Sequence, residues 1–188
     1  MAKSNSFVQG IQSSISYKLG EEENSGNWGD YVKGVTKILK KENFKFSGFK
    51  INVESTVPIG SGLSSSAALT VALMRAMAQA FQLDLSDLTI AKLGQRVENE
   101  FVGARVGIMD PMVISVARNP GKALYIDTAT LHYETVDIPN EAEIVVINSG
   151  VSHSNRGGGY LARRRECEEV ASLLKVEHLS KLNLNQLN

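Results

Sequence analysis

The chain has 188 residues, which suffice for one ordinary domain with a hydrophobic core or for part of a larger one. Its 20 Lys and Arg residues balance 20 Asp and Glu residues, and this neutrality argues against partners such as nucleic acid or an anionic membrane. Cys167 is the only cysteine, which excludes an intrachain disulfide framework and a cysteine zinc site.

The chain also lacks sequence signals for secretion or membrane insertion. Its first residues, MAKSNSFVQGIQSS, do not contain the apolar run of a secretory signal. The longest apolar stretch, residues 67–81, is interrupted by Arg75 and Gln79 before it reaches membrane-spanning length. We therefore expect a cytoplasmic protein with no membrane span.

Residues 1–27 are polar and uneven, and the first clear element is a helix that begins near Trp28. Its apolar residues recur at helical spacing and comprise Trp28, Tyr31, Val32, Val35, Ile38 and Leu39. Such a stripe is more often core packing than a ligand site. We interpret it as part of the core.

The next segments predict a strand, a loop and two helices. Strict alternation over residues 49–57 indicates a half-buried strand, which Pro58 ends. Residues 67–81 carry so few polar side chains that we expect a helix buried nearly all round. Ser86 is a suitable N-cap for a further helix that extends to Phe101 and contains Glu98.

The last third of the chain predicts a hairpin, a strand and a helix. Residues 123–126 and 131–138 are expected to pair around a turn, and residues 144–147 to form a buried strand. A helix over residues 160–174 should carry its Arg and Glu residues on a solvated face and bury Cys167. The closing LSKLNLNQLN resembles the opening of an unfinished element, which suggests a fragment.

The stretch VPIGSGLSSSAA contains a glycine- and serine-rich loop between the predicted strand and helix. Its residues are Gly60, Ser61, Gly62, Leu63, Ser64, Ser65 and Ser66. A glycine-rich backbone that opens a helix can direct several N–H groups at an anion such as phosphate, and serine hydroxyls can bind phosphate or Mg²⁺. Alternatively, one of the serines caps the helix. The loop's own residues leave these two interpretations level.

Other uses of this loop are less well supported. It lacks the lysine of a Walker P-loop and the third glycine of a dinucleotide-binding fingerprint. Ser64, Asp127 and His153 do occur in the chain order used by α/β-hydrolases. That alternative requires a parallel sheet, which the sequence does not predict.

Two acidic residues form the second candidate cluster. Glu98 stands twelve positions before Asp110, across a break that contains Gly103 and Gly107. Phosphoryl transfer to an alcohol needs a metal ligand and a carboxylate near the attacking hydroxyl, and these residues could supply them. Alternatively, Asp110 is the N-cap of a helix that starts at Pro111, and Glu98 belongs to a solvated helix face.

Together these segments resemble the galactokinases of the GHMP small-molecule kinase family. The resemblance lies in WGDYVKGV at residues 28–35, the loop at residues 58–68, GIMD at residues 107–110 and the segment 153–169. It covers residues 28–174. It implies an α+β fold of the ribosomal protein S5 domain 2-like type, with a mixed sheet and helices on one side. Residues 1–150 would form this N-terminal-type domain, and residues 151–188 the start of a truncated second lobe.

The resemblance also implies an activity, namely ATP-dependent phosphorylation of galactose at its anomeric hydroxyl, with ATP and Mg²⁺ as cofactors. The loop from Gly60 to Ser66 would hold the ATP phosphates, and Ser66 and Glu98 would bind Mg²⁺. Asp110 would accept the proton of the sugar hydroxyl, and Tyr160 would contact the sugar.

The chain departs from the family pattern in three places. No segment of the chain matches the family's first motif, a GRVNLIGEHTDY-like segment that carries most sugar contacts and an arginine. The glycine-rich third motif has no match either. Pro111 stands where galactokinases usually have glutamine. We therefore expect weak or no activity from this chain alone and exposed apolar surface that favours self-association. Alternatives are a kinase for N-acetylgalactosamine or arabinose, and a non-catalytic relative that binds sugar or ATP.

Overall fold

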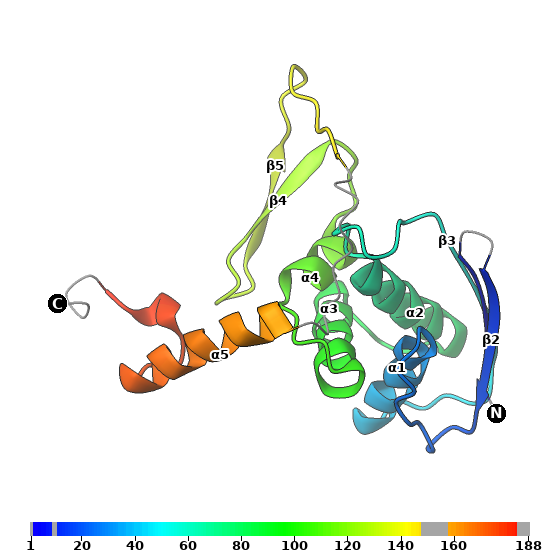
Figure 1. The fold of residues 1–188 in the computed structure, drawn as a ribbon. Coiled ribbons are helices and arrows are strands. Elements are labelled where there is room, and N and C mark those ends of the chain that lie inside the picture. Colours follow the sequence, from blue (N-terminus) through cyan, green and yellow to red (C-terminus); the bar gives the residue numbers. More distant parts are fainter. Residues whose placement is uncertain (1, 9–10, 148–157, 184–188) are drawn as a thin grey trace.

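The computed structural model describes residues 2–8, 11–147 and 158–183 of the chain. The elements are β1 (Ala2–Val8), β2 (Ile11–Tyr17), α1 (Gly29–Lys41), β3 (Lys50–Ser55), α2 (Ser65–Phe81), α3 (Asp87–Arg96), the π-helical turn η1 (Val97–Val102), α4 (Met109–Val116), β4 (Lys122–Ile126), β5 (Tyr133–Asp137), α5 (Gly158–Leu173) and the 3₁₀ turn η2 (Leu179–Lys181). Figure 1 shows their arrangement. None of the helices in these ranges is long and apolar enough to cross a membrane.

A three-stranded mixed sheet forms one layer of the fold. Its strand order is β2-β1-β3, with β1 antiparallel to β2 and parallel to β3. Helices α1 and α2 lie on the same side of this sheet (Figure 1), which confirms the expected α+β class. Strands β1 and β2 were not expected from the sequence, because their serine-rich segments carry no clear apolar alternation. Backbone pairing defines these strands.

Strand β3 confirms the predicted alternation. Ile51 and Val53 are half-buried, whereas Lys50, Asn52 and Glu54 are exposed. Side chains of a strand point alternately to opposite faces, so one face of β3 packs on the helices and the other meets water.

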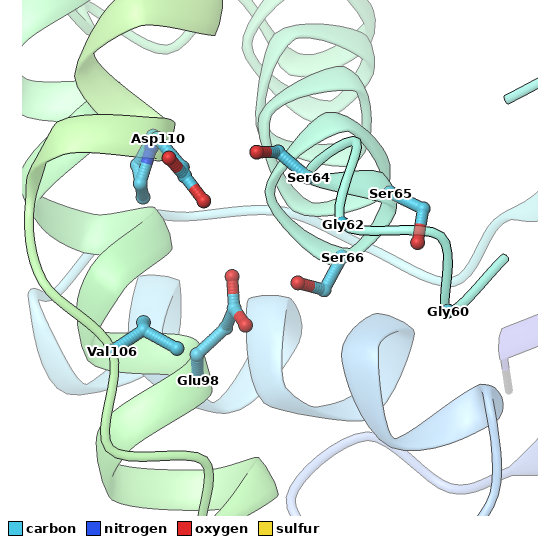
Figure 2. Close-up of a pocket in the computed structure, with 9 residues that line it drawn as sticks. Gly60, Gly62, Ser64, Ser65, Ser66, Glu98, Val106 and Asp110 are labelled. Atoms are coloured by element: carbon cyan, nitrogen blue, oxygen red, sulfur yellow. The ribbon is translucent and has the colours of Figure 1, made fainter. Parts of the chain in front are cut away.

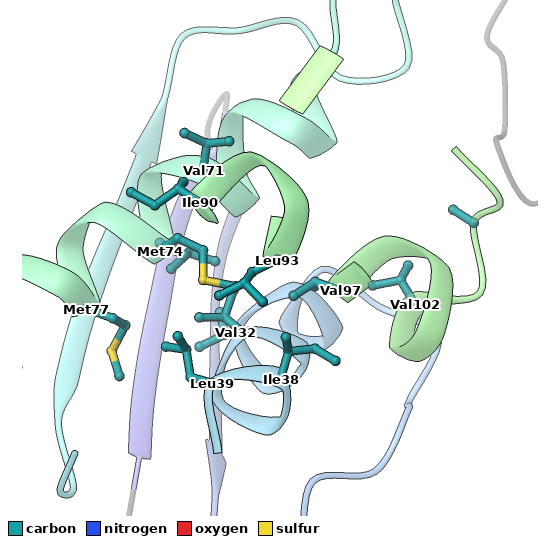
Figure 3. Close-up of a cluster of buried hydrophobic side chains, with 13 residues drawn as sticks. Val32, Ile38, Leu39, Val71, Met74, Met77, Ile90, Leu93, Val97 and Val102 are labelled. Carbon is teal, nitrogen blue, oxygen red and sulfur yellow. The ribbon is translucent and has the colours of Figure 1, made fainter. Parts of the chain in front are cut away.

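The core lies between this sheet and helices α1, α2, α3 and η1 (Figure 3). The residues drawn there include Val32, Ile38, Leu39, Val71, Met74, Met77, Ile90, Leu93, Val97 and Val102. The stripe of α1 therefore packs into the core, as predicted. Gly34 permits a close approach of α1 to η1, since a Cβ atom there would lie 2.7 Å from Cγ1 of Val97. This contact sets η1 directly against α1.

The expectation that α2 is buried nearly all round was wrong for one face. Ala72, Ala76 and Ala80 are exposed, one turn apart along the helix. Helices α1, α3 and α4 and the sheet cover the other faces. Alanine is apolar but small, so a stripe of alanines faces water at little cost in free energy.

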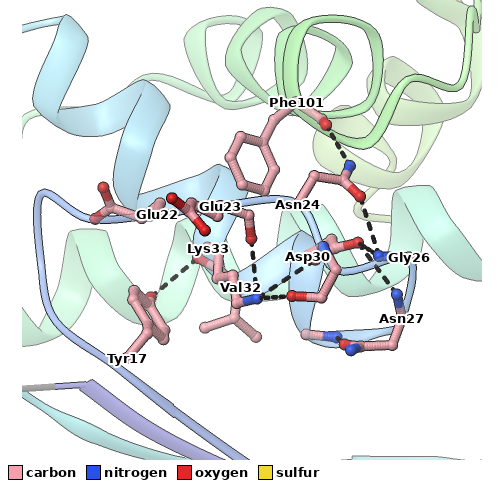
Figure 4. A network of polar contacts seen from close by, with 12 residues as sticks. Tyr17, Glu22, Glu23, Asn24, Gly26, Asn27, Asp30, Val32, Lys33 and Phe101 are labelled. Atoms are coloured by element: carbon pink, nitrogen blue, oxygen red, sulfur yellow. Dashed lines mark hydrogen bonds and ion pairs between the residues drawn. The ribbon is translucent and has the colours of Figure 1, made fainter.

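A buried polar network fixes the segment that leads into α1 (Figure 4). The Asp30 carboxylate is fully buried and accepts hydrogen bonds from the backbone N–H groups of Ser25 at 2.8 Å, Gly26 at 2.7 Å and Asn27 at 3.1 Å. A carboxylate with three N–H donors holds its loop in one conformation. The network therefore sets the position of Trp28, which follows directly.

The hairpin of β4 and β5 and helix α5 confirm their predictions, but two other expectations in this part were wrong. Residues 144–147 form no strand and are exposed, with Ile147 at 85%. Apolar residues favour a strand only where a neighbouring strand pairs with them, and no described strand does. Cys167 is exposed rather than buried.

Candidate active site

A cavity of about 260 Å³ lies where the N-terminus of α2, the turn η1 and the start of α4 meet (Figure 2). It is lined by Gly60, Gly62, Ser64, Ser65, Ser66, Glu98, Val106, Asp110 and Pro111. The fold thus brings most of the predicted site residues together. Ser61 and Leu63 do not line the cavity, and the Ser61 hydroxyl donates to the backbone carbonyl of Pro58 at 2.9 Å. The side chain of Tyr160 lies outside the described residues.

The glycine- and serine-rich loop bends through three left-handed residues. The φ angles are 68° at Gly60, 78° at Gly62 and 54° at Ser64. Ser64 occupies the N-cap position of α2, but its side chain makes no capping hydrogen bond. The capping interpretation is therefore wrong. In Figure 2 the hydroxyls of Ser64 and Ser66 point into the cavity, and that of Ser65 points away from it.

Glu98 is buried at the floor of this cavity. Its residue exposure is 1%, and its Oε2 atom has no hydrogen-bond partner among the described residues. Burial raises the pKa of this carboxyl to about 7; a hydrogen bond from Ser66 opposes the rise, and the charge of Asp110 adds to it. The alternative of a solvated helix face is wrong for Glu98. A buried carboxylate with a free oxygen is suited to a hard cation.

The π-helical turn explains how Glu98 reaches the cavity. Helix α3 continues into η1, which ends at Gly103 with φ 83°. The N–H of Ala104 closes the turn by donating to the carbonyl of Glu98 at 2.9 Å. Turns of this type are frequent at functional sites. The sequence indicated a regular helix here.

Asp110 lies in the first turn of α4 and points into the same cavity. The N-cap of α4 is Ile108, so the interpretation of Asp110 as the N-cap was wrong. Because Asp110 stands inside the helix, its carboxylate is available to a ligand. Figure 2 shows it facing the loop and Glu98 from the opposite wall.

An ion-paired network holds α2, α3 and α4 in this arrangement. Arg75 on α2 donates to the Asp87 carboxylate at 2.9 Å and to the carbonyl of Ser115 at 2.6 Å. The Ser115 hydroxyl donates to the carbonyl of Asp87 at 2.7 Å. Arg118 also donates to the Asp87 carboxylate. Hydrogen bonds from Arg118, which have the larger effect, and from Arg75 lower the pKa of the Asp87 carboxyl. The network fixes the three elements that carry the cavity walls.

The cavity contains few side chains that could hold a metal ion. Among the described residues, no group of three or more His, Cys, Asp or Glu side chains is placed to hold a metal ion. Mg²⁺ usually binds through one or two carboxylates together with waters and substrate phosphates. Glu98, with the Ser66 hydroxyl bonded to it, matches the protein's share of that kind of site.

A second cavity, of about 140 Å³, was not expected from the sequence. It is lined mainly by apolar residues and adjoins the first through shared Ser65 and Ser66. Its walls are Trp28, Tyr31, Val53, Ser55, Ile59 and Leu69. Trp28 and Tyr31 are half-buried, so they belong both to the core stripe and to this cavity. Their position at the N-terminal end of the apolar stripe of α1 was the sequence signal that could have indicated this cavity.

The hydrolase alternative is wrong. Asp127 sits in the turn between β4 and β5, where its carboxylate accepts the N–H of Ala129 at 2.8 Å, and it does not line the cavity with Ser64. The described sheets are mixed or antiparallel rather than parallel. His153 lies outside the described residues.

Residues 30–118 match the family model for the GHMP kinases N terminal domain. The galactokinase of Thermococcus kodakarensis is 38% identical over 168 residues, which cover 89% of this chain and 48% of that protein. The galactokinase of Thermotoga neapolitana is 41% identical over 153 residues, which cover 81% of this chain and 43% of that protein. The chain thus spans about half the length of the curated relatives it matches.

The fold is also similar to that in the crystal structure of Lactococcus lactis galactokinase complexed with galactose. The TM-score is 0.76 and the identity 24%, over 96% of this chain and 49% of that chain. Fold, cavity and family match together define a GHMP kinase N-terminal domain, and the chain belongs to the GHMP kinase family. The two relatives described above are galactokinases.

Proposed function

We propose that this chain forms the phosphate-binding and catalytic part of a galactokinase, which transfers the γ-phosphoryl group of ATP to the anomeric hydroxyl of galactose. The observation that carries the proposal is the position of Glu98, which faces Asp110 and the serine loop in one cavity and has a buried carboxylate oxygen with no hydrogen-bond partner in the described part of the chain. The galactokinase relatives support the choice of substrate.

The loop from Gly60 to Ser66 would hold the phosphates of ATP. The hydroxyls of Ser64 and Ser66 face the cavity, and the positive end of the 17-residue helix attracts an anion. Ser66 and Glu98 would hold Mg²⁺, for which the free Oε2 atom of Glu98 is a suitable ligand. When bound, the cation neutralises charge on the transferred phosphoryl group.

Asp110 would accept the proton of the attacking sugar hydroxyl. It stands on the wall opposite the loop, so a hydroxyl placed between them would have the carboxylate on one side and the phosphate on the other. Tyr160 would contact the sugar, as the resemblance to galactokinases implies.

The second cavity would receive the adenine base. It shares Ser65 and Ser66 with the phosphate cavity, and its walls include Trp28 and Tyr31. Aromatic side chains bind a planar base through stacking and apolar contact. One nucleotide could therefore occupy both cavities, with its phosphates across the N-terminus of α2.

The remaining properties of the protein follow as proposals. Residues 1–150 would be the N-terminal-type domain and residues 151–188 the start of a second lobe. The protein would act in the cytoplasm, without nucleic acid or membrane partners. Since no segment matches the family's first motif, we expect slow turnover from this chain alone. A kinase for N-acetylgalactosamine or arabinose, or a relative that binds without turnover, is the second candidate.

Calorimetric titration with Mg·ATP, followed by an assay of ADP release with each sugar, tests the proposal. We expect Mg·ATP to bind and galactose to raise ADP release more than N-acetylgalactosamine or arabinose does. A preference for another sugar would favour the related kinases, and binding with no turnover would favour the non-catalytic alternative. A chain that does not bind Mg·ATP would overturn the nucleotide site.

A further inference from the structure

Asn99 binds a loop that carries part of the cavity wall. It follows Glu98 in the turn η1, and its side chain contacts the backbone of Val106 twice. Its Oδ1 atom accepts the N–H of Val106 at 2.7 Å, and its Nδ2 atom donates to the carbonyl of Val106 at 3.3 Å. One amide side chain thus satisfies both backbone groups of a residue outside any helix or strand.

Val106 links this contact to the cavity. It lines the cavity itself and stands in the loop between η1 and α4, four residues before Asp110. Gln95, one turn before Asn99, also donates to the carbonyl of Val106, at 3.2 Å. Two amides on the helix that carries Glu98 therefore converge on the loop that leads to Asp110.

The loop that carries Val106 is fixed partly by packing, because Ala104 is buried in the core and Val106 packs against that core. Gly103 and Gly107 flank it, and a Cβ atom at either position would meet nothing within 4 Å. Apart from the side-chain contacts, the loop is held by hydrogen bonds from Ala104 N–H to Glu98 and from Val106 N–H to Ala104, both at 2.9 Å. Glycines with open surroundings allow the backbone to shift at both ends of the loop, so the hydrogen bonds of Asn99 add to packing in fixing the position of Val106.

We propose that Asn99 is a positioning residue that sets the placement of Glu98 relative to Asp110. It does not line the cavity, so it acts through Val106 and through its neighbour Glu98. The inference rests on the proposed function, in which Glu98 helps to hold Mg²⁺. Side chains that orient a metal ligand typically contribute a factor of about 10 to 100 in affinity.

A double-mutant cycle on the full 188-residue chain tests this inference. The variants are Asn99→Ala, Glu98→Gln and the double variant, and Mg·ATP binding is followed through the fluorescence of Trp28, the chain's only tryptophan. We expect Asn99→Ala to weaken Mg·ATP binding about 10- to 100-fold in the unaltered background. In the Glu98→Gln background the same change should have little effect, because its target is already absent.

Two further measurements separate positioning from general damage. Gln95→Ala is the matched control, since it removes a single bond to the same carbonyl and should cause a smaller loss. Hydrogen exchange at the Val106 amide should accelerate in Asn99→Ala and stay slow in Gln95→Ala. If Asn99→Ala fails to fold, Asn99→Asp replaces it in the same cycle. This variant keeps the 2.7 Å hydrogen bond from the Val106 N–H, so we expect a smaller loss of Mg·ATP affinity.

The outcomes separate the role of Asn99 from the proposed function. An equal loss of affinity in both backgrounds, or no loss in either, would overturn the role of Asn99 while leaving the nucleotide site intact. Failure of the unaltered chain to bind Mg·ATP would overturn the proposed function and, with it, this inference.

Discussion

Glu98 and Asp110 face each other across one cavity, although they come from different elements and only one of them is fully buried. The charge of Asp110 adds to burial in raising the pKa of Glu98 to about 7. Two ionised carboxylates placed in this way repel each other unless a cation in the cavity neutralises their charge. This relationship has consequences for stability and for activity.

The stability of the chain should depend on pH through Glu98. Its pKa is about 7 in the folded chain and near the ordinary 4.5 when unfolded, so the folded chain binds this proton more tightly. The free energy of unfolding should therefore fall by about 3 kcal/mol as the pH rises from about 4.5 to about 7, and then level off. Urea unfolding at several pH values without Mg²⁺ measures this. In Glu98→Gln the free energy of unfolding should no longer fall over this pH range, and this variant should be more stable than the unaltered chain at pH 8. An unchanged pH dependence in Glu98→Gln would contradict the assignment of this effect to Glu98.

Removing the carboxylate of Asp110 should affect turnover far more than binding. In the proposed reaction Asp110→Asn can no longer accept the sugar proton, and galactose-dependent ADP release should fall about 100- to 10,000-fold. Mg·ATP binding, measured by calorimetry, should change little or become tighter, since a negative charge leaves the cavity. Equal turnover in Asp110→Asn and the unaltered chain would argue against Asp110 as the base.

Gly62 should be required for the conformation of the loop. At its φ of 78° an added Cβ meets no neighbour within 4 Å, so Gly62→Ala causes backbone strain without a clash. We expect a loss of about 1–2 kcal/mol in stability or, if the loop relaxes instead, weaker Mg·ATP binding. Gly107→Ala is the matched control, because its surroundings are equally open and its φ lies outside the left-handed region. If both variants behave alike in urea unfolding and calorimetry, the strain argument fails.

The exposed segment at residues 144–147 should promote self-association. Its side chains are 64–85% exposed and form an apolar run of β-branched residues, which favours strand pairing with another chain. Val145→Lys should lower the concentration-dependent light scattering of the purified chain. Lys50→Arg, on the exposed face of β3, is a control that leaves the run intact. Scattering that is independent of concentration in the unaltered chain would disprove the expectation.

Local patterns in the sequence determined α1, β3, the hairpin of β4 and β5, and helix α5, because apolar spacing and turn residues act over a few neighbours. The serine loop and the pair of Glu98 and Asp110 were also identifiable, since their residue types suit phosphate and a cation. Residues 144–147 show the limit of such patterns, because their burial depended on a partner strand that the described fold does not supply.

Only the tertiary structure decided how these residues act. The π-helical turn buries Glu98, the left-handed Ser64 directs its hydroxyl into the cavity, and Trp28 and Tyr31 line a second cavity. Strands β1 and β2 likewise exist through pairing rather than through their own polar sequences. Burial, pKa and cavity shape depend on contacts between residues far apart in the chain, such as Asn99 with Val106 and Glu98 with Asp110, and spacing along the sequence does not encode those contacts.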